Sequence, residues 1–287
     1  MRVLLFLILA YNMIMFGKNK IVSYKDFKNE KPKTLKLTSV FYTLQGEGIY
    51  SGQRAVFVRL TGCNLQCSFC DTYFDSGEDY SFEQIKQMIL ESIETFNNKH
   101  GFAQTETTNL LVVLTGGEPM LQPNVVDFAE FCHSFGWRTQ TESNGLVNKT
   151  TLAMPESTTV IISPKVNEKT GKYLVPSAAV LERADALKFV ISSTDSSYGD
   201  IPQFALDLIG KKSIFVSPMN MYLNKPNKIG EDGTLLERST VDETISFWTP
   251  NLLDQKTNQE NHEYAALIAM KYGAILSLQS HLYASLP

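Results

Sequence analysis

The chain has 287 residues, of which 43% are hydrophobic and 20% are charged, as in an ordinary globular protein rather than a disordered or fibrous one. Its formal net charge of -4 argues against nonspecific binding of nucleic acid, which needs a basic surface. Four cysteines are too few for a scaffold built on disulfides, and the length suffices for one or two domains with a buried core.

The first part of the chain is an apolar extension. Met1 and Arg2 precede an apolar run from Val3 to Ala10, which resembles the start of an export signal. No small-residue cleavage site follows, and the run is shorter than the roughly 20 apolar residues of a membrane-spanning helix. Three interpretations stay open: a signal, an extension that touches a membrane or packs loosely, and a start codon assigned too early. We expect no stable membrane insertion, and we place residues 1–19 outside the core.

From residue 20 onwards, apolar segments typical of buried strands alternate with helical patterns. Several segments are continuous runs of Val, Ile, Leu and Phe, as expected for strands that are buried on both faces. This alternation predicts βαβ units and a parallel sheet, either open or curled into a barrel. The predicted strands cover residues 37–42, 55–60, 109–114, 138–141, 159–162, 186–191, 213–216 and 274–278.

Three helices are clearly predicted between or after these strands. Ser81 and Gln84 form a capping box in front of apolar residues at helical spacing, and the other helices cover 123–135 and 260–272. Cys132 falls on the apolar stripe of the second helix, so we expect a buried core thiol there. Residues 20–287 form a single predicted domain, with an insertion or long loop near 220–260 that contains at most a short helix.

Five predicted strands end in Gly, Pro and residues that form hydrogen bonds. Turn formation explains any one of these segments but explains five in succession less well. Parallel α/β sheets and barrels place their sites at this edge, so the segments predict a functional site. Their sequences are TGGEP at 115–119, ESNG at 142–145, SPK at 163–165, SPMN at 217–220 and QSH at 279–281.

Three of the four cysteines lie close together directly after the predicted strand 55–60. Cys63, Cys67 and Cys70 have the spacing C-x-x-x-C-x-x-C, and three thiolates on one loop can hold a soft metal centre. A structural zinc site needs a fourth ligand. His100 and His133 are candidates, but nothing in their spacing favours either of them. Three ligands on a four-iron cluster leave one iron open, as a reactive cluster requires. A zinc site and chance clustering remain the alternatives.

These motifs resemble the radical S-adenosylmethionine (SAM) superfamily. The cysteine loop carries an aromatic residue, Phe69, before its last cysteine, and the Gly-Gly-Glu-Pro segment that begins at Gly116 matches that superfamily's methionine-binding motif. Further motifs resemble the 7-carboxy-7-deazaguanine synthase family within it. They are FYTLQGEG at 41–48, CDT at 70–72, SPK at 163–165 and the tail QSHLYASLP at 279–287.

The resemblance implies an α/β fold, a partial (βα)6-type radical SAM barrel of parallel strands with outer helices. It implies a lyase that converts 6-carboxy-5,6,7,8-tetrahydropterin to 7-carboxy-7-deazaguanine with loss of ammonia, as in queuosine-type biosynthesis. The implied cofactors are a [4Fe-4S] cluster, SAM and Mg²⁺, whose radical chemistry the protein directs by orienting the substrate and excluding water. It further implies a reducing protein such as flavodoxin or ferredoxin, a cytoplasmic homodimer and no bound nucleic acid.

The resemblance also assigns cofactor residues. Cys63, Cys67 and Cys70 hold the cluster, and Thr72 supplies a hydroxyl ligand to Mg²⁺. Gly116 and Gly117 let the backbone approach the methionyl group of SAM, and Glu118 accepts from its ammonium group. The other residues expected to bind SAM are Phe69, Cys70, Asp71, Ser163, Pro164, Lys165, Ser217, Pro218, Met219 and Asn220.

The expected substrate residues come from the strand ends and from the tail. Arg59 clamps the substrate carboxylate, unless it is a surface arginine, and Thr115 matches another contact. Glu47 completes the catalytic candidates, with a turn residue as its alternative, and His281 either touches substrate or orients the tail. The remaining contacts implied by the family are Leu44, Gln45, Gly46 and the free carboxylate of Pro287.

Two positions depart from the family pattern. Ser143 replaces the usual Thr in Glu-Thr-Asn-Gly, and Ser217 replaces a Gln that is common before Pro-Met, so its side-chain contact is in doubt. Two other classes of function stay open at this point: a radical SAM enzyme of another specificity, such as an activating enzyme for a glycyl-radical protein, and a noncatalytic zinc-binding module.

Overall fold

The computed structural model describes residues 20–27, 31–72, 74–103, 106–222, 228–229, 235–237, 246–248 and 253–286. The expectations for the extension 1–19 and for Pro287 therefore lie outside the described residues, as does most of the segment 223–252.

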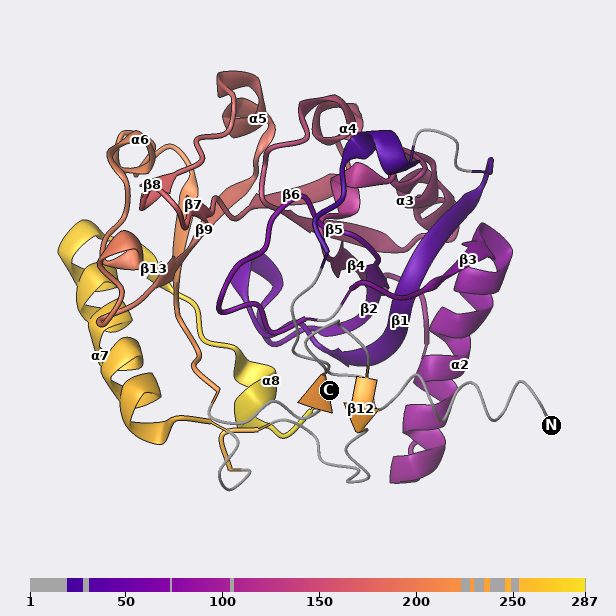
Figure 1. The fold of residues 1–287 in the computed structure, drawn as a ribbon. Coiled ribbons are helices and arrows are strands. Elements are labelled where there is room, and N and C mark those ends of the chain that lie inside the picture. The colour runs from indigo at the N-terminus through magenta and orange to yellow at the C-terminus, as the bar shows by residue number, and fades with distance from the viewer. Residues whose placement is uncertain are drawn as a thin grey trace.

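A nine-stranded sheet in the order β13-β10-β9-β6-β5-β4-β2-β1-β3 forms the centre of the molecule (Figure 1). The strands from β13 to β2 run parallel to one another, and β1 and β3 are added antiparallel at one edge. The strands are β1 (Thr34–Leu44), β2 (Arg54–Leu60), β3 (Glu78–Ser81), β4 (Leu111–Gly116), β5 (Arg138–Ser143), β6 (Thr158–Ile162), β9 (Ala186–Ile191), β10 (Ser213–Pro218) and β13 (Ile275–Leu276).

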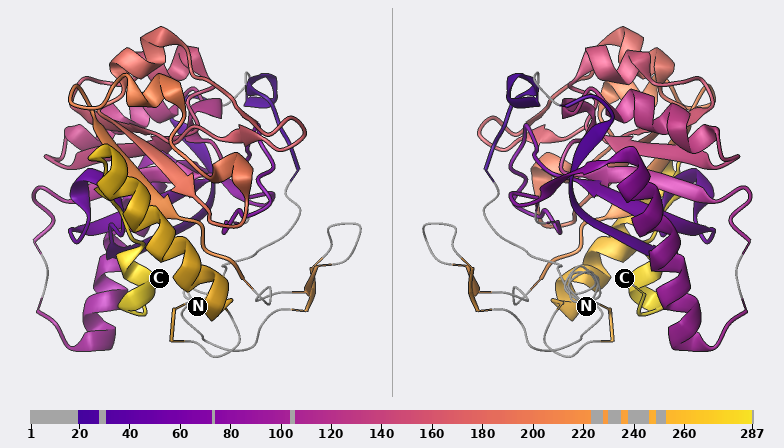
Figure 2. Two further views of the ribbon diagram at one scale, coloured as in Figure 1. Left: turned by 90° about the vertical axis from the view of Figure 1, so that its left-hand side faces the viewer. Right: turned by 90° about the vertical axis from the view of Figure 1, so that its right-hand side faces the viewer.

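A helix lies between each parallel strand and the next, which confirms the predicted partial (βα)6 pattern. The helices cover the outer side of the curved sheet in both Figure 1 and Figure 2. The two edge strands, β13 and β3, do not pair with each other, so the barrel is open. The helices are α2 (Phe82–His100), α3 (Val125–His133), α4 (Asn148–Ala153), α5 (Ala178–Arg183), α6 (Gln203–Leu206) and α7 (Gln255–Tyr272).

The first predicted strand, 37–42, does not belong to the parallel part of the sheet. It lies within β1, which pairs antiparallel with β2, with Tyr42 opposite Val56. Only a short turn joins the two strands, closed by hydrogen bonds between Gln45 and Gln53 and between Gly52 and Gln45. A parallel pairing needs a crossover of a dozen or more residues, so this connection permits only the antiparallel arrangement.

Local sequence signals account for the helix ends. The capping box is confirmed: the Ser81 hydroxyl accepts from the Gln84 backbone N–H, and the Gln84 side chain accepts from the Ser81 N–H. The last helix was predicted from residue 260, but α7 begins at Gln255 because the Asp254 carboxylate accepts from the Thr257 N–H and caps it there. No helix in the described part of the chain is long and apolar enough to cross a membrane.

The sequence did not predict several short elements that complete the fold. The hairpin of β7 (Val166–Asn167) and β8 (Lys172–Tyr173) follows β6, and α8 (Ser280–Tyr283) lies near the end of the chain. A second two-stranded sheet, β11 (Lys228–Ile229) with β12 (Leu235–Glu237), lies within the segment expected to be an insertion.

Side chains of the central strands point alternately to the two faces of the sheet, one of which forms the core and the other the site. On β9, Leu187, Phe189 and Ile191 point into the apolar core beneath the helices, whereas Lys188 and Val190 point to the other face and line a cavity. The helix side also contains Cys132, which is fully buried in the same core, as predicted.

Candidate active site

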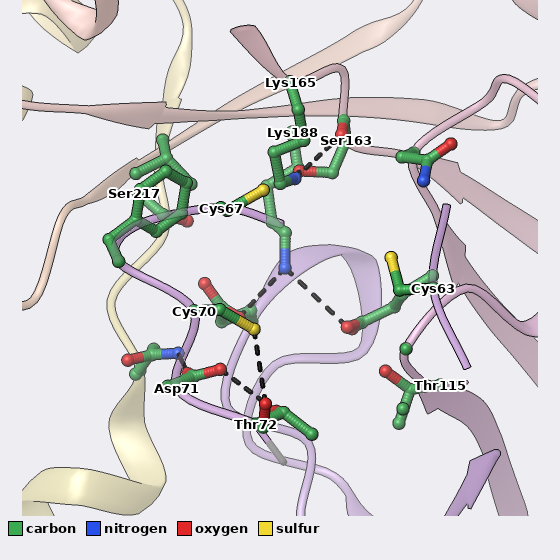
Figure 3. A pocket seen from close by; sticks show the side chains of 18 of the residues that line it. Cys63, Cys67, Cys70, Asp71, Thr72, Thr115, Ser163, Lys165, Lys188 and Ser217 are labelled. Carbon is green, nitrogen blue, oxygen red and sulfur yellow. Dashed lines mark hydrogen bonds and ion pairs between the residues drawn. The ribbon is translucent and has the colours of Figure 1, made fainter. Parts of the chain in front are cut away.

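One cavity lies at the carboxyl ends of the parallel strands and brings most of the predicted site residues together (Figure 3). Leu44, Gly46 and Pro164 are described but do not line it. The predicted residues that do line it are Gln45, Glu47, Arg59, Cys63, Cys67, Phe69, Cys70, Asp71, Thr72, Thr115, Gly116, Gly117, Glu118, Ser163, Lys165, Ser217, Pro218, Met219, Asn220 and His281.

The cysteine loop leaves β2 and passes along the inside of the curved sheet. A turn closed by the Cys70 N–H and the Cys67 carbonyl shapes the loop, and the Glu168 carboxylate accepts from the Ser68 N–H at 2.6 Å. Burial raises the pKa of the Cys63 and Cys70 thiols to about 12. Thiolates therefore need a cationic partner here, and an iron centre supplies one.

The cysteines fit a cluster better than a zinc ion. All three face one cavity, and within the described ranges no three His, Cys, Asp or Glu side chains gather closely enough to hold a single metal ion. Neither histidine candidate lines the cavity: His133 bonds to Thr139 and Ser157 on the outer side of the sheet, and His100 packs on Phe96. The two histidines considered as a fourth zinc ligand therefore do not lie beside these thiols.

The two glycines of the TGGEP segment are required by the cysteine loop itself. A Cβ on Gly117 would lie 2.0 Å from the Gly62 carbonyl oxygen, and one on Gly116, whose φ is +120°, would lie 2.2 Å from the Leu60 carbonyl oxygen. The Gly117 N–H donates to Leu60, and the Glu118 N–H donates to Gly62. The observed reason for these glycines is thus close packing of the end of β4 on the loop. The expected approach to SAM stays a prediction.

Glu118 is held by its own chain. One carboxylate oxygen accepts from the Met120 N–H and the Ser143 hydroxyl, and the other accepts from the Asn144 N–H at 2.7 Å. Burial raises the pKa of the Glu118 carboxyl, and these hydrogen bonds oppose the rise. Glu118 therefore joins the end of β4 to the end of β5, a structural role that the motif alone did not indicate.

Lys165 lies across the cavity close to the cysteines. Its ammonium group donates to the Ser163 carbonyl oxygen and hydroxyl, at 2.8 and 2.6 Å. Burial lowers the pKa of Lys165, and Cys67 opposes the change. The ring of Phe69 packs edge-on against Tyr198, 5.1 Å between centroids, and so anchors the loop to the later half of the sheet.

Arg59 projects from β2 into the cavity, which excludes a surface arginine. Its guanidinium lies 5.0 Å from the centre of the Phe41 ring and donates to the Thr72 hydroxyl at 3.2 Å, while its Nε has no partner although it is buried. Thr72 in turn donates to the Asp71 carboxylate. Arg59 thus combines one fixed contact with unused donor capacity directed at the site.

The charged residue that the sequence prediction missed is Lys188. Its ammonium group lies 3.0 Å from Glu47 and 3.8 Å from Glu142, and all three side chains are largely buried. Burial alone would raise the pKa of the Glu47 carboxyl, but Lys188 holds it below its usual value. Glu47 is therefore more than a turn residue. A lone lysine in the apolar run 186–191 was the available signal.

The end of the chain folds back over the turn between β1 and β2. The Ser280 N–H donates to the Gly46 carbonyl oxygen, and a Cβ on Gly46 would lie 2.4 Å from the His281 ring. Burial lowers the pKa of His281, which lines the cavity. This packing links the LQGEG and QSH motifs in space and explains why Gly46 is adjacent to the cavity rather than part of its wall.

Residues to which the sequence assigned no role complete the wall of the cavity. Gln279 accepts from the Asn220 side-chain amide and donates to Asp71 at 3.4 Å, so the tail contacts both the SPMN segment and the cysteine loop. Tyr222 comes from the segment expected to be an insertion, whose role the sequence did not reveal. The ESNG and QSH segments, which were expected at the site, line it with Glu142, Ser143, Asn144 and Gln279, although the sequence assigned these four no role. The lining residues that the sequence prediction missed are Phe57, Leu65, Phe74, Lys188, Val190 and Tyr222.

Comparison with known proteins agrees with this geometry. The family model described as "Radical SAM superfamily" matches residues 57–157. The 7-carboxy-7-deazaguanine synthase of Rickettsia prowazekii is 33% identical over 280 residues, which cover 92% of this chain and 97% of the relative. This chain belongs to the 7-carboxy-7-deazaguanine synthase family. The synthase of Hyperthermus butylicus is 28% identical and covers 88% of this chain and 94% of the relative.

The fold also has a counterpart among solved structures. A crystal structure of QueE from Escherichia coli matches with a TM-score of 0.52 at 19% identity and covers 90% of this chain and 98% of that one. At this identity the likeness concerns the fold alone. As a member of the radical SAM superfamily, this protein uses a [4Fe-4S] cluster and SAM, and the three thiols that line one cavity fit that requirement.

Proposed function

We propose that this protein is a 7-carboxy-7-deazaguanine synthase. It converts 6-carboxy-5,6,7,8-tetrahydropterin to 7-carboxy-7-deazaguanine with loss of ammonia. Its full-length similarity to the Rickettsia prowazekii synthase supports the assignment. The observation that carries it is the single cavity in which the cysteine loop, the LQGEG turn and the QSH tail meet, because the last two motifs distinguish this family from other radical SAM enzymes.

The cofactors have a place at the cysteine side of the cavity. When bound, the cluster and SAM supply the one-electron chemistry that starts the reaction by hydrogen abstraction. Cys63, Cys67 and Cys70 would hold the cluster. Ser163, Lys165 and the segment Ser217 to Asn220 would surround SAM, since they line the same cavity from β6 and β10.

A Mg²⁺ ion would bind at Thr72 beside the Asp71 carboxylate. Oxygen ligands suit this ion, and the Thr72 hydroxyl already lies 3.1 Å from an Asp71 oxygen. Arg59 occupies the same hydroxyl at 3.2 Å, so metal binding requires that the guanidinium exchange this contact for another acceptor. A substrate carboxylate is the natural acceptor, because the guanidinium fork matches it in two hydrogen bonds.

The opposite wall would hold the pterin ring. Gln45, Glu47 and Glu142 line the cavity with acceptor groups, and a 2-amino-4-oxopyrimidine ring presents N–H donors. Thr115 faces Arg59 across the β2–β4 ladder, which places a hydroxyl next to the carboxylate clamp. His281 closes the cavity from the tail, within reach of the turn that contains Gly46.

The proposed partners are a homodimer and a small reducing protein such as flavodoxin or ferredoxin. Exposed apolar side chains on α7 and β13 support association of two copies. Leu267 and Met270 lie one helical turn apart on α7, and Ile275 and Leu276 lie on the adjoining edge strand. Sedimentation of the anaerobically prepared protein tests the dimer.

Anaerobic turnover tests the function directly. The reconstituted protein, reduced in the presence of SAM, Mg²⁺ and 6-carboxy-5,6,7,8-tetrahydropterin, should form 7-carboxy-7-deazaguanine and 5′-deoxyadenosine, measured by chromatography and mass spectrometry. Deoxyadenosine without the deazapurine would disprove the proposed substrate and favour a radical SAM enzyme of another specificity. A protein that binds one zinc and no iron or sulfide would disprove the radical SAM assignment as well.

A further inference from the structure

A buried lysine stands alone among apolar residues in the middle of a central strand. Lys188 is 8% exposed, and its neighbours on β9, Leu187 and Phe189, are fully buried. Burial of an ammonium group costs several kcal/mol unless a partner compensates it. A buried ion pair is often no more stabilising than well-packed apolar side chains in place of all its partners, so fold stability alone does not explain the lysine.

The lysine joins carboxylates from two distant parts of the sheet. Glu47 reaches it from the turn after β1 at 3.0 Å, and Glu142 reaches it from the end of β5 at 3.8 Å. In Figure 3 its ammonium group points into the cavity with dashed lines to two partners. One cation therefore sets the place of two anions whose strands are not neighbours of β9.

Further hydrogen bonds connect this group to the predicted substrate turn. The Gln45 amide donates to Glu142 at 3.1 Å, and its oxygen accepts from the Glu47 N–H at 3.0 Å. Gln140 also donates to Glu142, at 3.2 Å. A displacement of the Glu142 carboxylate therefore removes a hydrogen bond that holds Gln45, one of the residues expected to contact the pterin.

We propose that Lys188 is a positioning residue of the reaction, which holds the carboxylates of Glu47 and Glu142 in place as acceptors for the N–H edge of the substrate. This inference rests on the proposed function. Without the ammonium group the two carboxylates repel each other in a buried cavity, so one of them turns away. An acceptor is then lost where the substrate presents a donor. Loss of the ammonium group should therefore weaken substrate binding rather than cluster assembly. Among the described residues, no hydrogen bond that the structure shows joins Lys188 to the cysteine loop.

Substitution of Lys188 separates this role from a structural one. Lys188→Met should raise KM for the pterin at least tenfold. It should also increase the fraction of deoxyadenosine released without product, because a misplaced substrate is not in position for hydrogen abstraction. Iron and sulfide content should match the wild type. Lys188→Arg restores the positive charge and should bring KM part of the way back. Lys211→Met, at an exposed lysine before β10, is the matched control and should leave KM unchanged.

The outcomes distinguish the inference from the proposed function. If the wild type forms product but Lys188→Met keeps its KM and coupling, Lys188 positions nothing and the inference alone fails. Equal losses of cluster content and activity in both the Met and Arg variants would show a merely structural lysine. If Lys188→Met does not fold, Lys188→Gln takes its place under the same criteria. A wild type that forms no product overturns the proposed function and this inference together.

Discussion

The two faces of the parallel sheet carry different kinds of side chain. The face beneath the helices is largely apolar, and Phe128 and Cys132 of α3 share one core with strand residues such as Leu114. The inner face has a small apolar cluster at the amino ends of the strands, formed by Leu111 and Val113 of β4 with Ala55. Towards the carboxyl ends the same face carries arginine, lysine and glutamate. A single strand therefore contributes to the core at its amino end and to the site at its carboxyl end.

The charged half of the inner face contains two kinds of buried carboxylate. Glu118 receives three hydrogen bonds from neutral groups, and its pKa is raised by burial. Glu47 faces a cation, and its pKa is lowered despite burial. Hydrogen bonds from the backbone fix a group in one place, whereas an ion pair in a cavity can exchange its partner for a ligand. We therefore expect Glu118 to matter for assembly and Glu47 for substrate.

The largest difference between the two faces should come from the cysteines. Cys63→Ser should remove the cluster and reduce turnover by at least about a thousandfold, since a hydroxyl is a poor ligand for iron. Cys132→Ser should keep iron, sulfide and turnover, and should lower the free energy of unfolding by about 1–3 kcal/mol, because it buries a hydroxyl in an apolar core. Iron analysis, anaerobic turnover and denaturant titration measure these effects. Loss of iron in Cys132→Ser would show that the core thiol contributes to the cluster.

The next largest effect should follow from Gly117→Ala. The added methyl group would lie 2.0 Å from the Gly62 carbonyl, which immediately precedes Cys63, so the cysteine loop must move. We expect incomplete cluster assembly and turnover lower by about a hundredfold, given how strongly catalysis depends on placement within about 1 Å.

Gly199→Ala is the control for this change. A Cβ there would meet nothing closer than 3.3 Å, and Gly199 lies outside the cavity lining. Its iron content and turnover should equal those of the wild type. Full cluster content in Gly117→Ala would mean that the loop tolerates the displacement. The glycine would then be explained by the expected close approach of its backbone to SAM.

A smaller effect should separate the two carboxylates. Glu47→Gln should raise KM for the pterin about tenfold and leave cluster content unchanged, since Glu142 still neutralises Lys188. Glu118→Gln should lower the free energy of unfolding by about 1–3 kcal/mol, because its amide NH₂ must face an N–H or O–H donor. Kinetics and denaturant titration of both variants test the comparison. A reversal, with KM changed only in Glu118→Gln, would refute it.

The sequence predicted most of the fold because each signal was local. The capping box at Ser81, the apolar runs of the central strands and the segments at their ends need only neighbouring residues to be recognised. The direction of β1 depended on the length of a turn, and the start of α7 on a cap at Asp254. Both signals were present in the sequence, but neither was used in the prediction.

The site was predicted less completely, for a physical reason. Motifs identified residues next to glycine, proline and cysteine, which mark the strand ends. Lys188 belongs to the site through Glu47, 141 positions earlier in the chain, and no local pattern reveals such a partner. Likewise, the reason for Gly117 is the backbone of the cysteine loop, a contact that exists only after folding.

The smallest expected effect concerns the tail at His281. Burial lowers the pKa of its imidazole, so the unfolded chain binds a proton more readily than the folded one between that lowered value and 6.5. Stability should therefore fall as the pH falls through this window. His281→Gln should flatten the slope between pH 7.5 and 5.5, whereas His100→Gln, on the outer helix α2, should retain it. Denaturant titration across this range measures both slopes. Parallel curves for the wild type and His281→Gln would show that the His281 imidazole binds a proton equally well in the folded and the unfolded chain.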